Sequence, residues 1–517
     1  MEAKKVNLLR SLASVSGMTL ASRVLGFLRD MITARAFGAG FATDAFFVAF
    51  KLPNLLRRVF AEGAFSQAFV PVLAEYKTQK THLETKAFVA SIAGVLAFVL
   101  AIIVLIGIIF SGVVITITAP GFTHDPDKIA LTIKLFRITL PYILFISLAS
   151  LVSGILNTWR IFVIPAFTPI LLNLSFIIFT VFLRQYFHVQ ILALAWAVFV
   201  GGILQLLFQL PYLKKIDIAI LPKLDFKNPA VWRVIKLMGP AIFAMSISQI
   251  SLVINTIFAS FLKSGSITWM YFADRLMEFP TGVLGVALGT ILLPSLSKHA
   301  SNKDTESFSR TLDWGVRLCL ILAVPATVGL AITARQLTIT LLMYGKFSMY
   351  DVVMTEKALI AYSIGLIGLI LVKIFGPGFY ANQDIKTPVK IAIAVLIATQ
   401  LMNLIFIGPF KHAGLALSIG LGACLNAGNL CYWLIKKKIY VPEKGWRIFL
   451  AKLMVAIICM TIALELSVHY LPLDFMGRAY IRGISMLILL FVAVLSYFIS
   501  LYLLGFRLKQ FILKESH

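Results

Sequence analysis

Residues 88–117 read FVASIAGVLAFVLAIIVLIGIIFSGVVITI, a run of thirty residues without a single charged side chain. A helix needs about 20 apolar residues to cross the ~30 Å hydrocarbon core of a bilayer. Strands of a membrane barrel are about ten residues long and alternate apolar with polar residues, and this run does not alternate. The stretch therefore predicts a membrane-spanning helix.

Comparable apolar runs recur along the chain, for example at 165–183, 391–407 and 484–504. Of the 517 residues, 60% are hydrophobic and only 13% are charged, whereas about a quarter are charged in soluble domains. We therefore predict an all-α polytopic membrane protein with about fourteen transmembrane helices. The predicted spans are 11–36, 43–73, 87–117, 130–157, 161–183, 190–213, 232–262, 267–296, 310–334, 355–381, 388–408, 413–435, 448–470 and 480–505.

The formal net charge is +25, from 47 Lys and Arg residues against 22 Asp and Glu residues. In a soluble protein this balance would indicate nucleic-acid binding, but cytoplasmic loops of membrane proteins also collect Lys and Arg. An even number of spans puts both termini on one side. Assigning that side to the cytoplasm places most basic residues, including Lys214–Lys215 and Lys436–Lys438, on the inner flanks. We expect cytoplasmic termini and no nucleic-acid partner.

An internal repeat relates the two halves of the chain. The stretch from Leu192 through Lys215 matches the stretch from Leu415 through Lys438 without a gap, and the same offset of about 223 residues pairs Pro71 with Pro294. Each copy holds six spans, so the copies share one orientation, as in transporters that bind substrate between two lobes. We predict lobes at 1–222 and 223–438, with an added pair of spans in 439–517.

Ionisable side chains fall inside several predicted spans. Each Arg, Lys or Asp at the middle of a membrane helix costs roughly 2.5–3.5 kcal/mol. At a rise of ~1.5 Å per residue, Arg23 lies ~18 Å and Arg57 ~21 Å from the start of its span, too deep to reach an interface easily. These side chains must face water or one another. They are Arg23, Arg29 and Asp30 in the first span, Asp44, Lys51, Arg57, Arg58 and Glu62 in the second, and Asp274, Arg275 and Glu278 in the eighth.

Two interpretations of these charges are open. Pairs at i,i+3 and i,i+4 spacing, such as Arg275 with Glu278 and Arg58 with Glu62, can neutralise each other within a helix, and the whole set could tie helices together. However, the basic residues of this set outnumber its acids, six against five. An excess of cations in a low-dielectric wall favours an anionic ligand, and Arg is suited to phosphate because it can donate two parallel hydrogen bonds. We therefore predict a cavity for a phosphate-bearing amphiphile around the arginines.

Four motifs extend this interpretation. They are SRVLGF at 22–27, ATDAFFVAFKLPNLLRR at 42–58, FAEGAFSQAFVP at 60–71 and YFADRLMEFP at 271–280. These motifs resemble those of the MurJ/MviN family of lipid II flippases, and the resemblance extends over essentially the whole chain. It implies a fold similar to the multidrug/oligosaccharidyl-lipid/polysaccharide exporters, with two six-helix lobes forming a V and two further helices.

The resemblance also implies a function, which is delivery of lipid II to the outer leaflet of the bacterial plasma membrane for wall synthesis. Lipid II is the undecaprenyl-pyrophosphate-linked precursor of peptidoglycan. At matching positions, the essential cavity charges of the family are Arg23, Arg29, Asp44, Arg57 and Arg275. The last two spans would line a groove for the lipid tail. The implied partners are lipid II and the phospholipid bilayer, with wall-synthesis enzymes as further candidates.

The expected mechanism is alternating access without a cofactor. The pyrophosphate would meet the arginines, and Asp44 would act in closing or opening the outer side. The seventh span offers Ser, Gln and Asn but no carboxylate, so we predict no particular coupling ion. An inside-negative potential drives an anion outward by about 2.3 kcal/mol per charge per 100 mV, which makes the membrane potential the expected energy source.

Signs of an enzyme are missing from the sequence. It has no GxxxxGK[ST] phosphate loop, HExxH zinc motif or GxSxG elbow. The four cysteines, Cys319, Cys424, Cys431 and Cys459, show no CxxC spacing and are interpreted as small core residues. Alternatives are an exporter of another polyprenyl-linked oligosaccharide or a multidrug exporter of the same fold. From a different class, a membrane scaffold or a polyprenyl-dependent enzyme of wall synthesis is considered, although such an enzyme should carry a large outer loop or an acid/His cluster.

Overall fold

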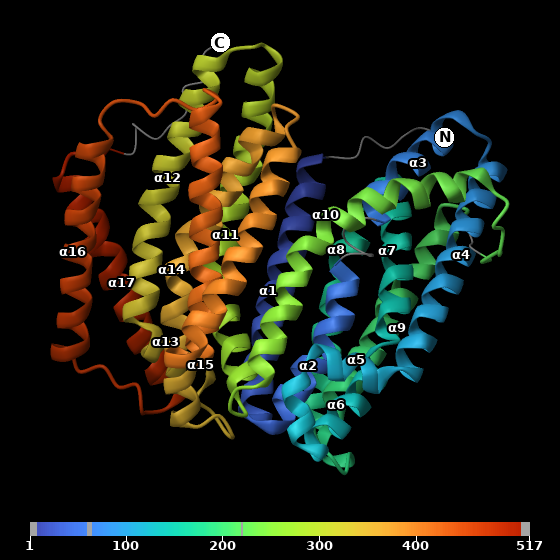
Figure 1. The fold of residues 1–517 in the computed structure, drawn as a ribbon, viewed down its shortest axis with the longest axis horizontal. Coiled ribbons are helices and arrows are strands. Elements are labelled where there is room, and N and C mark those ends of the chain that lie inside the picture. The colour runs from blue at the N-terminus through green and yellow to red at the C-terminus, as the bar shows by residue number, and fades with distance from the viewer. Residues whose placement is uncertain (1–7, 59–64, 219–220, 508–517) are drawn as a thin grey trace. The chain divides into compact units, whose positions relative to one another are not determined.

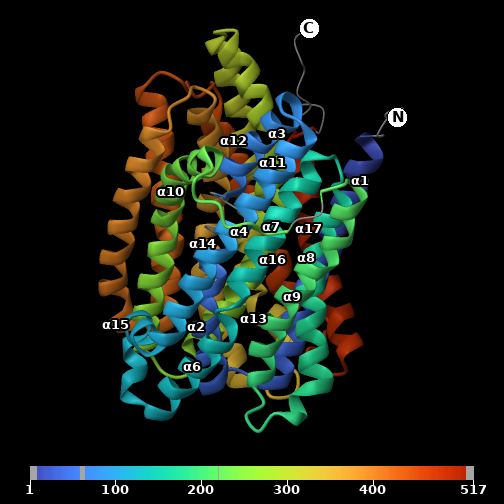
Figure 2. The same ribbon diagram turned by 90° about the vertical axis from the view of Figure 1, so that its right-hand side faces the viewer.

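The computed structural model describes residues 8–58, 65–218 and 221–507, and every regular element that these residues form is a helix (Figures 1 and 2). Within these ranges, nine helices are long and apolar enough to cross a membrane by length and composition. The chain is therefore an all-helical, multi-pass membrane protein. It forms two compact units, Met1–Thr268 and Trp269–His517.

The first unit runs from α1 to α10, and a proline explains one break in it. The predicted span 130–157 is divided into two helices at Leu140–Pro141, because proline has no backbone N–H to donate within a helix. The helices of this unit are α1 (Leu8–Phe37), α2 (Phe41–Leu56), α3 (Phe65–Gln79), α4 (His82–Ile109), α5 (Ser111–Thr118), α6 (Pro126–Thr139), α7 (Tyr142–Thr158), α8 (Val163–Ile178), α9 (Leu192–Lys215) and α10 (Pro229–Ser260).

Aromatic side chains occupy the core between α3, α4 and α7. The ring centroid of Phe88 lies 4.4 Å from that of Tyr76 and 5.9 Å from that of Phe69, and both pairs are stacked. Leu151 and Ile155 of α7 are buried in the same cluster, which also takes in residues of α10. This packing includes α10 in the first unit, although the sequence repeat begins a new copy near residue 223.

The second unit takes in most of α11 and all later helices. The predicted spans 388–408 and 413–435 both fall in α15, where Lys411 has φ 52° and ψ −128° and breaks the helix into two parts. The helices are α11 (Ser266–Ser301), α12 (Thr305–Ile332), α13 (Ala334–Leu342), α14 (Met349–Tyr380), α15 (Lys386–Lys436), α16 (Trp446–Tyr470) and α17 (Ala479–Leu503).

Small residues bring α14 and the second part of α15 into direct backbone contact. A Cβ atom on Gly365 would lie 2.3 Å from the Cα of Gly420, and one on Gly368 would lie 2.5 Å from the amide nitrogen of Cys424. Helix pairs in membranes are held by such close packing, because lipid tails are as apolar as the side chains and provide little driving force of their own. The two glycines therefore fix the distance between these helices.

The last two helices pack on each other and on α12. Phe449, Leu453 and Leu489 are buried in one cluster with Ile321 of α12. The hydroxyl of Tyr497 donates a hydrogen bond of 2.6 Å to the carbonyl of Ile321. The added pair of helices is thus attached to the second unit.

Each predicted span coincides with helix over most of its described length. The matched stretches of the repeat also take similar positions, because Leu192–Ala195 and Leu415–Ala416 are all buried where a membrane helix begins. The predicted lobe boundaries remain a prediction. One detail is wrong: Cys319 is buried as expected, but Cys459 is exposed and is not a core residue, because it lies on the outer surface of α16.

Candidate functional site

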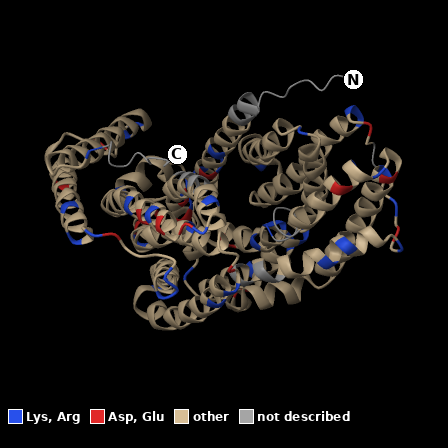
Figure 3. Cartoon of the chain, turned by 90° about the horizontal axis from the view of Figure 1, so that it is seen from above, with Lys and Arg blue, Asp and Glu red and all other residues tan. Residues whose placement is uncertain are grey.

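Charged residues occupy few positions in the structure. Seen from above, most of the ribbon is free of them, and the basic and acidic residues gather in short stretches (Figure 3). Several of these stretches lie inside helices, where the sequence predicts them.

Arg29 and Asp30 form an ion pair in the interior of α1. The Arg29 guanidinium donates to Asp30 Oδ1 from Nη2 at 2.7 Å and from Nε at 2.9 Å. On α8, Asn173 Oδ1 accepts from Arg29 Nη1 at 3.1 Å, while its Nδ2 donates to the carbonyl of Ser22 at 3.0 Å. The ring of Phe176 lies 5.0 Å from the guanidinium carbon. These contacts orient the guanidinium and join α1 to α8 by polar bonds inside an apolar span.

Sequence reasoning missed Asn173. The side chain is buried, with 7% of its surface exposed, and it stands alone in the apolar run Ile170–Leu174. Polar groups inside a membrane helix are costly unless they find a partner. A single amide side chain in an apolar stretch is therefore the signal by which the sequence could have identified Asn173.

The other basic residues of α1 and α2 differ in their surroundings. Arg23 is exposed on α1. Arg57 is half-buried just after α2, and its Nε donates to Asn54 Oδ1 at 3.0 Å. Lys51 and Arg58 are also half-buried.

Positive charge is in excess along this part of the chain. From residue 23 to residue 58 there are six basic side chains and two acidic ones, Asp30 and Asp44. Glu62 lies outside the described residues, so its expected pairing with Arg58 stays a prediction. That this region attracts an anion stays a prediction.

Asp44 is held by several hydrogen bonds and by a neighbouring lysine. It lies in the first turn of α2 and is 1% exposed. Its Oδ1 accepts from the amide and the hydroxyl of Thr268, at 3.0 and 2.7 Å, and its Oδ2 accepts from the amide of Gly265 at 2.7 Å. Lys128 Nζ on α6 lies 3.3 Å from Oδ2. One carboxylate therefore joins α2, α6 and the segment after α10 within the first unit.

Lys128 is a second residue that the sequence did not single out. It is 6% exposed, bonds Ser264 Oγ at 3.2 Å and lies 4.2 Å from the centre of the Phe122 ring. It precedes the predicted span 130–157, so no apolar run around it marks it as unusual. A buried ammonium needs a partner, and Asp44 is the carboxylate that the structure places beside it.

In the second unit, Arg275 and Glu278 of α11 form the ion pair that their i,i+3 spacing allows. The guanidinium carbon of Arg275 also lies 5.1 Å from the centre of the Tyr271 ring. Asp274 is half-buried on the same helix. Arg275 is half-buried and Glu278 is exposed. The predicted grouping of Arg275 with the arginines of the first unit stays a prediction.

The protein is all-helical, has an internal repeat and carries ionisable side chains inside its membrane helices. These are features of a membrane transporter. Comparison with protein families refines this class. The family described as Lipid II flippase MurJ matches residues 33–501. The chain belongs to the lipid II flippase MurJ family.

Two relatives align with almost the full length of this chain. It is 49% identical to the Lipid II flippase MurJ of Burkholderia cenocepacia, over 98% of this chain and 99% of the relative. It is 46% identical to the Probable lipid II flippase MurJ of Buchnera aphidicola subsp. Acyrthosiphon pisum, over 99% and 100%.

Solved structures show the same fold. The structure titled Lipid II flippase MurJ, inward closed conformation, matches with a TM-score of 0.79 at 28% identity and covers 94% of this chain and 97% of its own. An inward-facing multidrug transporter of the MATE family in the MOP superfamily matches with a TM-score of 0.64 at 13% identity, over 81% and 97%. The second match shows the shared fold alone.

Proposed function

We propose that this protein is a lipid II flippase, which moves the polyprenyl-pyrophosphate-linked peptidoglycan precursor from the inner to the outer leaflet. The observation that carries the proposal is full-length membership in a family named for this activity. The buried polar cluster around Arg29 supports it, because a transporter of an anionic headgroup needs basic side chains at bilayer depth.

The proposed arrangement has about fourteen membrane crossings in the bacterial inner membrane, with both termini in the cytoplasm. The helices that match the predicted spans and the basic stretches Lys214–Lys215 and Lys436–Lys438 support this topology. Two six-helix lobes and the added helices α16 and α17 would make up the molecule.

In the proposed alternating-access cycle, the pyrophosphate meets Arg23, Arg29 and Arg275, with Arg57 nearby. Asn173 and Asp30 hold the guanidinium of Arg29 in place, so that the group does not need to be ordered when the anion arrives. The excess basic charge between residues 23 and 58 is offset when the anion binds.

Asp44 would act in closing or opening the outer side of the protein during this cycle. Its carboxylate holds the amides of Gly265 and Thr268, which lie at the start of α11. Amide groups at the start of a helix favour a negative charge, so this contact would stabilise one state. Opening the outer side would require the carboxylate to release these amides.

A flipping assay with fluorescent lipid II in reconstituted vesicles tests the proposal. We expect Arg29→Ala to abolish transport, because the cluster loses its cation. Asn173→Leu should slow transport by about tenfold, which corresponds to about 1.4 kcal/mol, since the cation remains but one of its orienting bonds is lost.

Two matched variants serve as controls in this assay. Ser175→Ala removes a buried hydroxyl from the same helix α8, and Arg335→Ala removes an exposed arginine that pairs with Glu356. Both should flip at the wild-type rate. Normal transport by folded Arg29→Ala protein would refute the site, and absence of flipping by the wild-type protein would refute the function.

A further inference from the structure

An apolar cavity of about 540 Å³ lies in the second unit and has no part in the mechanism above. It is lined by Leu371 and Phe375 of α14, by Cys424 and Cys431 of α15, and by Trp446 at the start of α16. We call it the α14–α15 cavity. Its lining is hydrocarbon and sulfur over most of its surface, so it suits a chain of carbon atoms rather than a polar headgroup.

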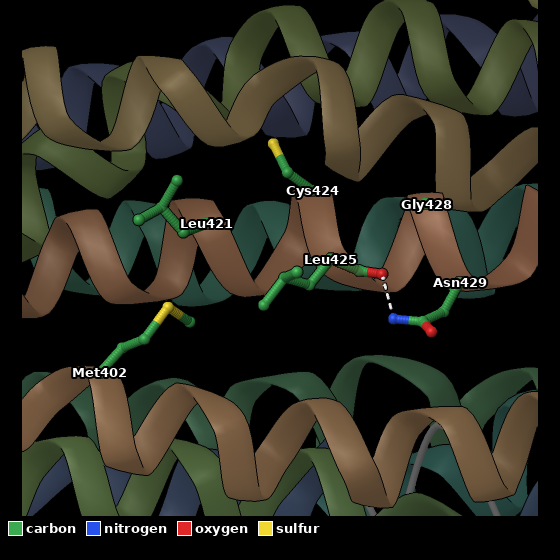
Figure 4. Close-up of a pocket in the computed structure, with 6 residues that line it drawn as sticks. All are labelled: Met402, Leu421, Cys424, Leu425, Gly428 and Asn429. Atoms are coloured by element: carbon green, nitrogen blue, oxygen red, sulfur yellow. Dashed lines mark hydrogen bonds between the residues drawn. The ribbon is translucent and has the colours of Figure 1, made fainter.

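A second apolar space of about 420 Å³ adjoins the first, because Cys424 and Gly428 line both. Figure 4 shows Cys424 and Leu425 projecting from one helical stretch and Met402 from the neighbouring one. Leu425 is 42% exposed and Gly428 is exposed. The space therefore opens on the outer surface of helices that lie in the bilayer, where lipid chains are the available occupants.

One wall of the α14–α15 cavity is held by a buried carboxylate. Asp313 of α12 is 1% exposed. It accepts hydrogen bonds from Tyr440 Oη at 2.6 Å, Trp446 Nε1 at 2.8 Å and Arg317 Nε at 2.7 Å. Tyr440 and Trp446 both line the cavity. Charge-assisted bonds of this kind are strong, so the wall is ordered before any ligand arrives.

The segment that contributes Tyr440 and Trp446 to this wall is rich in basic residues. The segment 436–447 carries Lys436, Lys437, Lys438, Lys444 and Arg447 and a single acid, Glu443. Lys437 is bonded to Asp384. Across the described ranges, the structure gives no carboxylate partner for Lys438, Lys444 or Arg447, and all three are exposed. The segment therefore carries exposed cations next to residues that line an apolar space.

We propose that the α14–α15 cavity binds one acyl chain of an anionic phospholipid, whose phosphate contacts Lys438, Lys444 and Arg447. Basic pockets between helices at the cytoplasmic surface are typical sites for anionic headgroups. Trp446 is the first residue of α16, and tryptophan is enriched where membrane helices meet the interface. A single acyl chain suits the cavity better than a polyprenyl chain, which has several times the bulk. This proposal does not depend on the flippase activity.

The test uses the full-length protein in phosphatidylcholine vesicles that contain a phosphatidylglycerol probe with a photoreactive diazirine at one chain end. After illumination, mass spectrometry locates the labelled peptides. We expect labelling of the peptides that contain Leu371, Cys424 and Gly428. It should be several times stronger than with a phosphatidylcholine probe of the same chain.

Two variants separate the chain site from the headgroup site. Gly428→Leu fills the cavity, and it should fit because a Cβ there meets nothing within 4 Å. It should remove the labelling, whereas Gly483→Leu on α17, with equally open surroundings, should not. Lys444→Gln/Arg447→Gln should abolish the preference for the anionic probe. Lys214→Gln/Lys215→Gln, at the basic pair matched in the repeat, should keep it.

Thiol accessibility gives an independent measurement on the wild-type protein. In detergent, added phosphatidylglycerol should slow alkylation of Cys424 and Cys431 severalfold and leave the exposed Cys459 unchanged. The proposal is overturned if Gly428→Leu is labelled like the wild type. It is also overturned if both probes label equally or if a polyprenyl-phosphate probe labels these peptides in preference. Equal slowing of alkylation at Cys459 and at Cys424 and Cys431 would overturn it as well.

Discussion

Asp44 and Lys128 bring opposite charges from α2 and α6 into contact inside the first unit. Both side chains are buried, with 2% and 7% of the side-chain surface exposed, and their closest atoms lie 3.3 Å apart. Breaking such a pair on one side leaves an uncompensated buried charge, which is more costly than removing both partners. The pair is therefore a structural element as well as a candidate part of the transport cycle.

We predict that Lys128→Met destabilises the purified protein by about 3–5 kcal/mol, because the Asp44 carboxylate loses its cation. The double variant Asp44→Asn/Lys128→Met should regain much of this loss. Thermal unfolding in detergent measures both effects.

Lys86→Met is the matched control for this measurement. Lys86 pairs with Asp217 at 2.9 Å, but the Asp217 side chain is 80% exposed, and exposed pairs are worth at most about 1 kcal/mol. Equal shifts for the two lysine variants would contradict the importance assigned to the buried pair.

At the scale of helices, an ion pair joins the turn after α14 to the end of α15. Lys437 Nζ donates to Asp384 Oδ2 at 2.5 Å, and the hydroxyl and amide of Thr387 donate to the same carboxylate at 2.7 and 3.0 Å. Partial burial raises the pKa of Asp384, but these hydrogen bonds outweigh it and lower the pKa from 3.8 to about 2.

A pH dependence of stability follows from this shift. The folded pKa of Asp384 is below the unfolded value, so the stabilisation is complete above the unfolded pKa of 3.8 and is lost as the pH falls toward about 2. After allowance for solvent screening, we expect about 1–2 kcal/mol. Asp384→Asn should remove this component, as seen by comparing unfolding temperatures at neutral and acid pH. An identical acid sensitivity of variant and wild type would count against the assignment.

Helix positions could be predicted from the sequence because a membrane span requires a long apolar run, and such runs are visible without an alignment. The contact of Arg29 with Asn173 could not be predicted from the sequence. The two residues are 144 positions apart and meet only because α1 packs on α8. The same holds for Lys128, whose burial depends on the fold of the segment before α6. Cys459 was misjudged because an apolar residue in a membrane protein can face lipid as well as the core.

At the scale of the whole molecule, the negative charge of the proposed substrate predicts a dependence of transport on membrane potential. We predict that an inside-negative potential accelerates outward movement of lipid II severalfold in reconstituted vesicles, because each negative charge gains about 2.3 kcal/mol per 100 mV. A potassium gradient with valinomycin sets the potential, and protein-free vesicles give the background. Unchanged flipping after the potential is dissipated would exclude this energy source.

The candidate site as a whole was only partly accessible to sequence reasoning. The charged residues of α1, α2 and α11 could be named, because each ionisable group inside an apolar run is unusual by itself. The pairing of Arg275 with Glu278 could also be predicted, because it follows from their i,i+3 spacing on one helix. The partners of Asp44 could not, because they lie more than 80 positions away in the sequence. Local spacing explains the first kind of pair and tertiary packing the second.

The position of Asp313 has a consequence for how the protein is made. Its carboxylate is synthesised 127 residues before the hydroxyl of Tyr440 that bonds it. At about 5–20 residues per second, a ribosome needs roughly 6 to 25 seconds to supply that partner. During this interval the acid has only its helical neighbour Arg317. A nascent chain that stalls before Tyr440 would present an unfinished polar contact to the insertion machinery and to quality-control proteases.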